Sequence, residues 1–352
     1  MLDSLFQCSI LSRNRSRLPE VRGCSLEKTP LGRLRTVAVE TGGSSVIFGE
    51  LILHSFGQMI SELSPANNAI PRLAYQIAFI RQRIKARSKG LEEGFSLVMP
   101  TRNRKEFLSC AITAVITSTR APFELIIMDN ASSDGTQEMC QALEKQQPGI
   151  IRYVRLNRNF GTNAYALGFL KAKFKYLVDM DDDILAISND WDRATIDAFN
   201  SFPKLGFLAM NVIQDKYTNG GKHDVSEYSE RTAGGSTVEV GPTGGWFSIT
   251  TRPIYNDVGG FVFLPYKPFP AEDGKYVRRL ARKGYFAGIL KGSFVYHASG
   301  PIWNAAFGYK GTWIEKYQRH HKHLVPVIDE VDLSEPPSFQ YAKNMVTNAP
   351  TS

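Results

Sequence analysis

A regular alternation of apolar runs and helical patterns between residues 95 and 178 is the feature that most limits what this chain can fold into. Each apolar run has the length of a strand and ends in polar residues before the next helical pattern begins. Alternating strands and helices predict a parallel sheet covered by helices. We predict strands at residues 95–99, 123–128, 150–156 and 174–178, and helices at 105–118, 135–145 and 162–172.

Polar residues follow the end of each predicted strand. The carboxyl ends of parallel strands meet at one edge of an open α/β sheet, and ligands bind there. We therefore expect the functional side chains to come from four segments at that edge, residues 101–104, 129–134, 157–163 and 179–183.

The last of these segments carries four carboxylates in five positions, at Asp179, Asp181, Asp182 and Asp183. Like charges this close repel, so each raises the cost of ionising the next. A bound cation offsets that repulsion, and a hard divalent metal that also holds a substrate phosphate is suited to such a place. The alternative is a solvated acidic turn before a helix, which the helix dipole favours.

The overall composition excludes several classes of protein. The chain has 352 residues, enough for one large core and an appendage. The sequence has no run of about 18 apolar residues, so it predicts no membrane-spanning helix. We find no GxGxxG after the first predicted strand, no phosphate-binding P-loop, no nucleophile elbow and no zinc-like Cys/His spacing. Cys110 and Cys140 fall in helical patterns, and reduced cysteines together with a start unlike a secretory signal predict a cytoplasmic protein.

The net charge of +8 is concentrated near the N-terminus: residues 1–90 hold 13 Lys or Arg against 6 Asp or Glu, and residues 91–352 hold 29 against 28. Residues 70–89 form one basic helical pattern. Its apolar row is Leu73, Ile77, Ile80 and Ile84. Such a helix can lie peripherally on an anionic membrane, here the inner face. The commoner arrangement is a helix packed on the next domain, with its basic face in water.

The pattern loosens in the C-terminal half. We expect further strands at residues 206–212, 237–240, 244–250, 286–290 and 294–296, a mobile loop at 217–236, and a helix at 273–283. Residues 46–53 are a candidate strand, and the polar tail from residue 334 is expected to be poorly ordered. We therefore divide the chain into a basic N-terminal extension at 1–93, a main domain at 94–300, and a C-terminal helical segment with a flexible tail at 301–352.

Several ordered motifs resemble a known family. They are PTRNR from Pro100, ELIIMDNASSDGT from Glu124, NRNFG from Asn157, DMDD from Asp179, TGGWFS from Thr243, DVGGF from Asp257, and Glu272-Asp273 followed by Arg278 and Gly284. In this order, over residues 95–300, they resemble the GT-A glycosyltransferase family 2. The resemblance implies a GT-A fold, which is a Rossmann-like α/β arrangement with a mostly parallel sheet flanked by helices. The N-terminal extension would be mixed or helical.

The resemblance also implies roles for single residues. The nucleotide-binding group is Thr101, Asn103, Arg104, Asp129, Gly161, Asn163 and Asp179. Asp181 would bind the metal, with His297 as a second ligand, and Asp273 would be the general base. The acceptor-binding group is Gly244, Gly245, Trp246 and Glu272.

Each of these roles has a structural alternative. Asp129 could form an Asx turn, Asp273 could cap its helix, and Gly161 with Asn163 could be an ordinary loop and cap. Trp246 could belong to the core. A lone histidine such as His297 is more often structural.

The implied activity is metal-dependent, inverting transfer of a sugar from a nucleoside-diphosphate sugar, with Mg²⁺ or Mn²⁺ as cofactor. Asp129 favours a UDP- or dTDP-sugar. The acceptor hydroxyl could belong to a glycan, a lipid-linked glycan or a peptide. QxxRW is missing, which favours transfer of one sugar or a few. The main rival is a non-catalytic nucleotide-sugar-binding module of the same fold. A nucleic-acid partner is not expected, because the basic N-terminus lacks interleaved aromatic residues.

Overall fold

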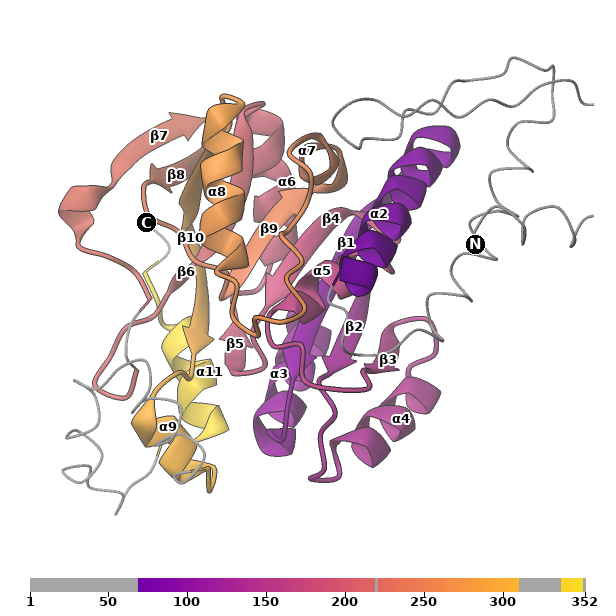
Figure 1. The fold of residues 1–352 in the computed structure, drawn as a ribbon. Coiled ribbons are helices and arrows are strands. Elements are labelled where there is room, and N and C mark those ends of the chain that lie inside the picture. The colour runs from indigo at the N-terminus through magenta and orange to yellow at the C-terminus, as the bar shows by residue number, and fades with distance from the viewer. Residues whose placement is uncertain (1–68, 219–220, 310–336, 351–352) are drawn as a thin grey trace, which may run out of the picture. The chain divides into compact units, whose positions relative to one another are not determined.

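The computed structural model describes residues 69–218, 221–309 and 337–350, which belong to one compact unit, Leu63–Ser352. Its first half is the predicted alternation of strands and helices (Figure 1). Four strands pair in parallel in the order β3-β2-β1-β4. The strands are β1 (Glu92–Thr101), β2 (Phe123–Asp129), β3 (Ile151–Arg155) and β4 (Phe174–Met180), and the helices between them are α3 (Lys105–Ser118), α4 (Thr136–Gln146) and α5 (Asn163–Phe169).

The second half of the sheet is mixed. Strand β9 (Phe247–Thr251) lies antiparallel between β4 and β6 (Leu205–Val212), and β10 (Phe286–His297) runs parallel to β6. Residues 286–290 and 294–296, predicted as two strands, form the single strand β10, with a register shift between them. The outer strands are β8 (Ser236–Val240), β7 (Ser229–Ala233) and β5 (Ile184–Ile187), which pairs with β10. The predicted loop at 217–236 therefore contains strand β7 and the short 3-10 helix η1 (Val225–Glu227), because β7 finds a partner in β8.

Two hydrophobic layers cover the two faces of the sheet. Helices α3, α4 and α6 (Trp191–Ser201) contribute to one layer. Helices α2 (Ala69–Lys89), α5, α7 (Arg252–Asp257) and α8 (Glu272–Arg282) contribute to the other. Strands β1, β2 and β4 are buried on both faces, which explains their nearly continuous apolar runs. The predicted α/β class is confirmed.

A third cluster closes one end of the sheet. Helices α9 (Pro301–Ala306) and α11 (Phe339–Thr347) pack there against β5 and the end of β10. Trp303 of α9 and Ala342 of α11 are fully buried, and the Tyr341 hydroxyl donates to Asp215 at 3.0 Å. The expectation of a poorly ordered tail is therefore wrong for residues 339–347, because their apolar side chains have a partner surface that the local sequence does not reveal.

Helix α2 forms where the sequence predicts it, and it packs on the domain, but through a different row of side chains. Tyr75 and Phe79 are buried against the loop that follows α7. The Tyr75 ring stacks on Phe263 with centroids 4.8 Å apart. The helix does not pack on the domain through the predicted apolar row, because its members Leu73, Ile80 and Ile84 are exposed. Aromatic rings bury more area than aliphatic chains, so the aromatic row takes the inner position.

The candidate strand at 46–53 lies outside the described residues, as does the rest of the extension up to residue 68. Within the described ranges, each helix is too short or too polar to cross a lipid bilayer.

Candidate active site

The acidic loop, residues 181–183, joins β4 to β5 at the carboxyl edge of the parallel strands. Its backbone is fixed on both sides: Asp181 N donates to the Trp246 carbonyl at 3.0 Å, and Ala298 N donates to the Asp183 carbonyl at 2.9 Å. Strands β9 and β10 therefore hold the loop from two directions, which keeps its carboxylates close together in spite of their charge.

Asp182 is held by the loop that follows β1. Its two carboxylate oxygens accept hydrogen bonds from the Thr101 hydroxyl at 2.7 Å and from Arg104 Nη1 at 2.5 Å. Arg104 Nη2 also donates to Asp183 Oδ2 at 2.9 Å, and its guanidinium lies over the Phe107 ring. Thr101 and Arg104, which we predict to be near a nucleotide, thus contact the acidic loop and neutralise part of its charge.

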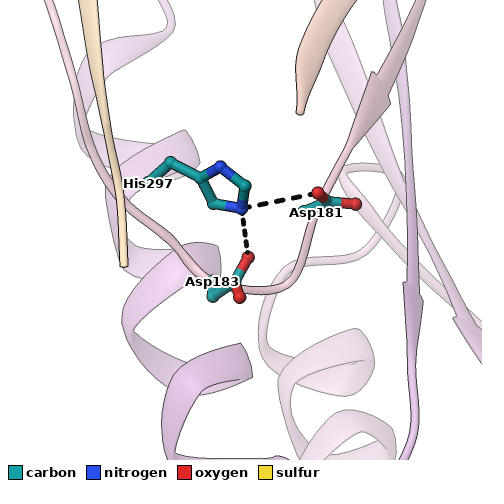
Figure 2. Close-up of side chains that lie close together, drawn as sticks. All are labelled: Asp181, Asp183 and His297. Carbon is teal, nitrogen blue, oxygen red and sulfur yellow. Dashed lines mark ion pairs between the residues drawn. The ribbon is translucent and has the colours of Figure 1, made fainter. Parts of the chain in front are cut away.

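Asp181, Asp183 and His297 point toward one another (Figure 2). His297 Nε2 lies 3.0 Å from Asp183 Oδ1 and 3.5 Å from Asp181 Oδ2. One ligand atom from each residue lies within 4.8 Å of the other two. Among the described residues, this is the group of three side chains that could hold a metal ion. Asp183, rather than Asp179, joins Asp181 and His297 in this metal trio.

The protonation states in the trio depend on one another. Burial acts to raise the pKa of Asp183, but Arg104 and His297 lower it overall. Burial lowers the pKa of His297, and Asp183 raises it more, so that its pKa lies above the ordinary value. Burial, together with Asp183 and Asp182, raises the pKa of Asp181 in spite of His297. In the absence of a metal, a proton on His297 can therefore balance the carboxylates, and a bound cation would displace that proton.

The trio fits a hard divalent cation. Asp183 Oδ1 is buried, and apart from its ion pair with His297 it accepts no hydrogen bond from the described residues. A buried carboxylate oxygen is costly unless a cation lies beside it, either the protonated imidazole of His297 or a metal ion. Carboxylate oxygens and one imidazole nitrogen suit Mg²⁺ less than Mn²⁺, which accepts both donor types.

Asp179 belongs to a second group of carboxylates. It is 1 % exposed, its Oδ1 accepts from Ser248 N at 3.1 Å, and it faces Asp273 across Gly245. A Cβ on Gly245 would lie 2.9 Å from Asp179 Oδ2 and 3.5 Å from Asp273 Cβ, so the two carboxylates need a glycine between them. Burial first, and then Asp273, raises the pKa of Asp179 well above its ordinary value.

Asp273 and Glu272 begin helix α8. Gly245 N donates to Asp273 Oδ2 at 3.3 Å, and Gly274 N donates to Oδ1 at 2.7 Å. Glu272 is buried and accepts from the Thr162 hydroxyl at 2.5 Å. Asp273 is only partly buried, so its carboxylate is the one of this pair that a substrate can reach.

Gly161 and Asn163 lie against the segment that leads into α8, residues 264–271. Gly161 has φ +58°, and a Cβ there would lie 2.0 Å from the Pro268 carbonyl. Asn163 accepts from Leu264 N at 2.7 Å and donates to the Lys267 carbonyl at 2.8 Å. The predicted nucleotide role of both residues stays a prediction, and the contacts observed here tether residues 264–271.

Asp129 ends β2 and is fully buried. Its Oδ2 accepts from the Tyr153 hydroxyl at 2.6 Å and from Arg155 at 2.8 Å, and its Oδ1 accepts from Ser132 N at 2.8 Å. The Ser132 bond reaches three residues on, one residue further than the Asx turn that we consider as the structural alternative. Asp129 thereby positions Arg155, whose side chain is 39 % exposed at the same edge.

The remaining predicted residues have structural contacts. Asn103, at φ +52°, accepts from Ser133 N at 2.7 Å and so joins the loops after β1 and β2. Trp246 is 6 % exposed, and its indole N–H donates to the Met210 carbonyl at 2.9 Å. The core alternative for Trp246 is therefore the one observed. Gly244 lies under the Trp246 ring, which a Cβ would approach to 2.7 Å.

Tyr165 is a residue that the sequence analysis missed. It is buried on α5, and its hydroxyl donates to Asp181 Oδ1 at 2.7 Å. This bond orients the carboxylate and leaves Oδ2 directed at His297. Its position in a helical apolar pattern resembles that of an ordinary core residue, so the sequence alone holds no signal for this contact.

Comparison with known proteins identifies similar glycosyltransferases. Residues 96–251 match the family model described as Glycosyl transferase family 2. The chain is 28 % identical over 178 residues to a poly-β-1,6-N-acetyl-D-glucosamine synthase of Staphylococcus epidermidis. This alignment covers 47 % of this chain and 42 % of that protein. The chain is also 25 % identical over 150 residues to an undecaprenyl-phosphate 4-deoxy-4-formamido-L-arabinose transferase of Serratia proteamaculans. This second alignment covers 42 % of this chain and 46 % of that protein.

The chain thus spans less than half the length of these curated relatives. A solved structure of the mannosyltransferase PcManGT from Pyrobaculum calidifontis aligns with a TM-score of 0.48 and 15 % identity, over 80 % of this chain and 77 % of that one. The motifs that the family model covers include the ends of β1, β2 and β4, from which the acidic loop and its supports come. Over residues 96–251, this chain is therefore similar to glycosyl transferase family 2.

Proposed function

We propose that this chain transfers a sugar from a nucleoside-diphosphate sugar to an acceptor hydroxyl, with inversion at the anomeric carbon. The observation that carries the proposal is that one segment, Gly245-Trp246, contacts both the acidic loop and Asp273. Trp246 O accepts from Asp181 N in the acidic loop, and the preceding residue, Gly245, donates to Asp273. A cation site and a candidate base therefore share one edge of the sheet, as a displacement at a diphosphate-linked carbon requires.

Asp181, Asp183 and His297 would hold Mn²⁺ or Mg²⁺. When bound, the ion neutralises negative charge that develops on the leaving diphosphate. Arg104 fixes Asp183 and Tyr165 fixes Asp181, so the ligand atoms are already placed before the ion arrives.

Asp273 is the proposed general base. It lies in the first turn of α8, and its Oδ2 accepts a hydrogen bond from Gly245 N at 3.3 Å. The carboxylate takes the proton of the acceptor hydroxyl as the oxygen attacks the anomeric carbon, while the bond from that carbon to the diphosphate oxygen breaks. One displacement of this kind inverts the configuration. Asp179 is buried on the other side of Gly245, and its proposed role is to contact the donor rather than the acceptor proton.

A uridine or thymidine donor is proposed from the place of Asp129. Its carboxylate already accepts from Tyr153, Arg155 and Ser132. Direct contact with a base N–H would require one of these bonds to be exchanged, so the half-exposed Arg155 is the more accessible contact for a base. The acceptor is a hydroxyl of a glycan, a lipid-linked glycan or a peptide.

The test is nucleotide release from UDP-, GDP- and dTDP-sugars with Mn²⁺, with and without a chelator. We expect one donor to be consumed, with loss of activity in chelator and recovery when Mn²⁺ is restored. Asp273→Asn should lower turnover about 10³-fold. Asp197→Asn, at an exposed site on α6 with an equivalent chemical change, should have no effect.

The non-catalytic binding module remains the alternative, because a cation site alone also binds a nucleotide sugar. Donor binding without turnover, by wild type and Asp273→Asn alike and with glycan acceptors supplied, would favour that alternative.

A further inference from the structure

The outer face of α2 carries a row of exposed aliphatic side chains. Leu73 is 48 %, Ile80 54 % and Ile84 60 % exposed, and their spacing places them on one side of the helix. They are half of the large hydrophobic residues that are exposed in the described part of the chain. An aliphatic row this exposed on an otherwise well-packed domain marks a contact surface.

Basic side chains accompany this row. Arg72, Arg81 and Lys85 are exposed and each is the sequence neighbour of one member of the row, so they project on either side of it. The whole helix contains six Lys or Arg and no Asp or Glu. Residues 1–68, in contrast, carry seven Lys or Arg and six Asp or Glu, so the basic excess of the N-terminal region belongs to α2.

We propose that this face of α2 docks the protein on an anionic lipid bilayer. An apolar row flanked by cations matches the boundary between acyl chains and anionic headgroups, where aliphatic side chains insert and basic side chains meet phosphate. Pairing with a second copy of α2 would bring six positive charges against six without a compensating carboxylate. Residues 1–68, with nearly balanced charge, offer the helix no electrostatic complement.

The inner face of α2 links this surface to the proposed acceptor side. The Tyr75 ring stacks on Phe263, and the Tyr75 hydroxyl donates to the Phe261 carbonyl at 3.4 Å. Gly260, at φ +66°, has no room for a Cβ, which would lie 2.8 Å from the rings of Phe79 and Tyr255. The chain continues from here through residues 264–271 into α8 and Asp273.

Membrane docking through α2 would therefore hold the acceptor-side segment near the bilayer surface. This consequence rests on the proposed function, and it favours a lipid-linked acceptor over a free glycan or a peptide. The docking itself does not depend on catalysis and can be measured without donor or metal.

The experiment is co-sedimentation of the full chain with vesicles of phosphatidylcholine alone and of phosphatidylcholine mixed with phosphatidylglycerol. We expect binding to the anionic vesicles that weakens with added salt, and little binding to the neutral ones. The triple substitution Leu73→Ser, Ile80→Ser and Ile84→Ser should weaken binding to anionic vesicles at least about tenfold. Val225→Ser, which removes a more exposed aliphatic side chain from η1, is the matched control and should bind as wild type.

A second variant separates charge from apolar contact. Arg72→Gln with Arg81→Gln keeps the aliphatic row and should remove most of the preference for anionic vesicles. Thermal melting of each variant establishes that it is folded. The proposal is overturned if wild type does not bind anionic vesicles, or if the triple variant binds as well as wild type. It is also overturned if wild type self-associates in sedimentation through this face and the triple variant does not.

Discussion

Asp183 and Asp273 lie at the same edge of the sheet but have opposite surroundings. Asp183 is paired with the guanidinium of Arg104 and the imidazole of His297. Among the described residues, Asp273 receives hydrogen bonds from backbone N–H groups, Gly245 and Gly274. Positive side chains allow carboxylates to collect without strong repulsion, whereas these backbone donors to Asp273 carry no charge. The first environment suits a cation site and the second suits a base.

The largest expected effect comes from separating these two roles. Asp273→Asn should lower turnover about 10³-fold and leave the affinity for Mn²⁺ unchanged, because the amide keeps the shape but cannot take a proton. Asp181→Asn should lower both. Steady-state nucleotide release and Mn²⁺ binding followed by electron paramagnetic resonance measure the two quantities. Equal loss of metal affinity in both variants would contradict the division.

Replacing Arg104, whose guanidinium neutralises part of the acidic loop, should lower the stability of the fold. Arg104→Met should lower the free energy of unfolding by about 3 kcal/mol in metal-free protein, since it removes the guanidinium that pairs with both Asp182 and Asp183. Mn²⁺ should recover more stability in this variant than in wild type. Denaturant unfolding with and without Mn²⁺ tests this. Arg193→Met, which breaks an exposed pair with Asp197, is the control and should change little.

Filling the space between Asp179 and Asp273 should lower turnover more than it lowers the affinity for Mn²⁺. Gly245→Ala would place a Cβ 2.9 Å from Asp179 Oδ2, so either Asp179 or Asp273 has to move. We expect turnover to fall about a hundredfold, with Mn²⁺ affinity close to that of wild type. Gly235→Ala, at φ +80° and with no neighbour within 4 Å of the added Cβ, strains the backbone away from the site and controls for a general loss of stability. A variant with normal turnover would show that the spacing across Gly245 is not critical.

The smallest effect concerns the orientation of a single ligand. Tyr165→Phe removes the hydroxyl that donates to Asp181 Oδ1 and should weaken Mn²⁺ binding about tenfold. Tyr153→Phe removes an equivalent hydroxyl from Asp129 instead and should not change the metal affinity. Isothermal titration with Mn²⁺ compares the two. Similar affinities in the two variants would mean that Tyr165 does not position the ligand.

The sequence predicts the part of the fold in which local pattern and tertiary structure agree. The strands and helices between residues 95 and 180 follow from apolar runs that end in polar residues, and the acidic loop is evident because four carboxylates stand together. Helix α11 and strand β7 could not be predicted in this way, because each is stabilised by a partner surface far away in the sequence.

Within the site, the sequence identifies charged residues but not their partners. The sequence alone does not distinguish Asp179 from Asp183. The pairing of β4 with β9 turns Asp179 away from the metal trio and toward Ser248 and Asp273. Helix α2 is a similar case. Its sequence contains an aliphatic row and an aromatic row, and periodicity alone does not decide which row is buried.

The most direct test of this account is the dissociation constant of Mn²⁺ for wild type, Asp183→Asn and Asp179→Asn, measured by electron paramagnetic resonance of the free ion. The account predicts that wild type binds Mn²⁺, that Asp183→Asn loses at least about a hundredfold in affinity, and that Asp179→Asn stays within a few-fold of wild type. Loss of binding in Asp179→Asn with normal binding in Asp183→Asn would contradict the metal trio.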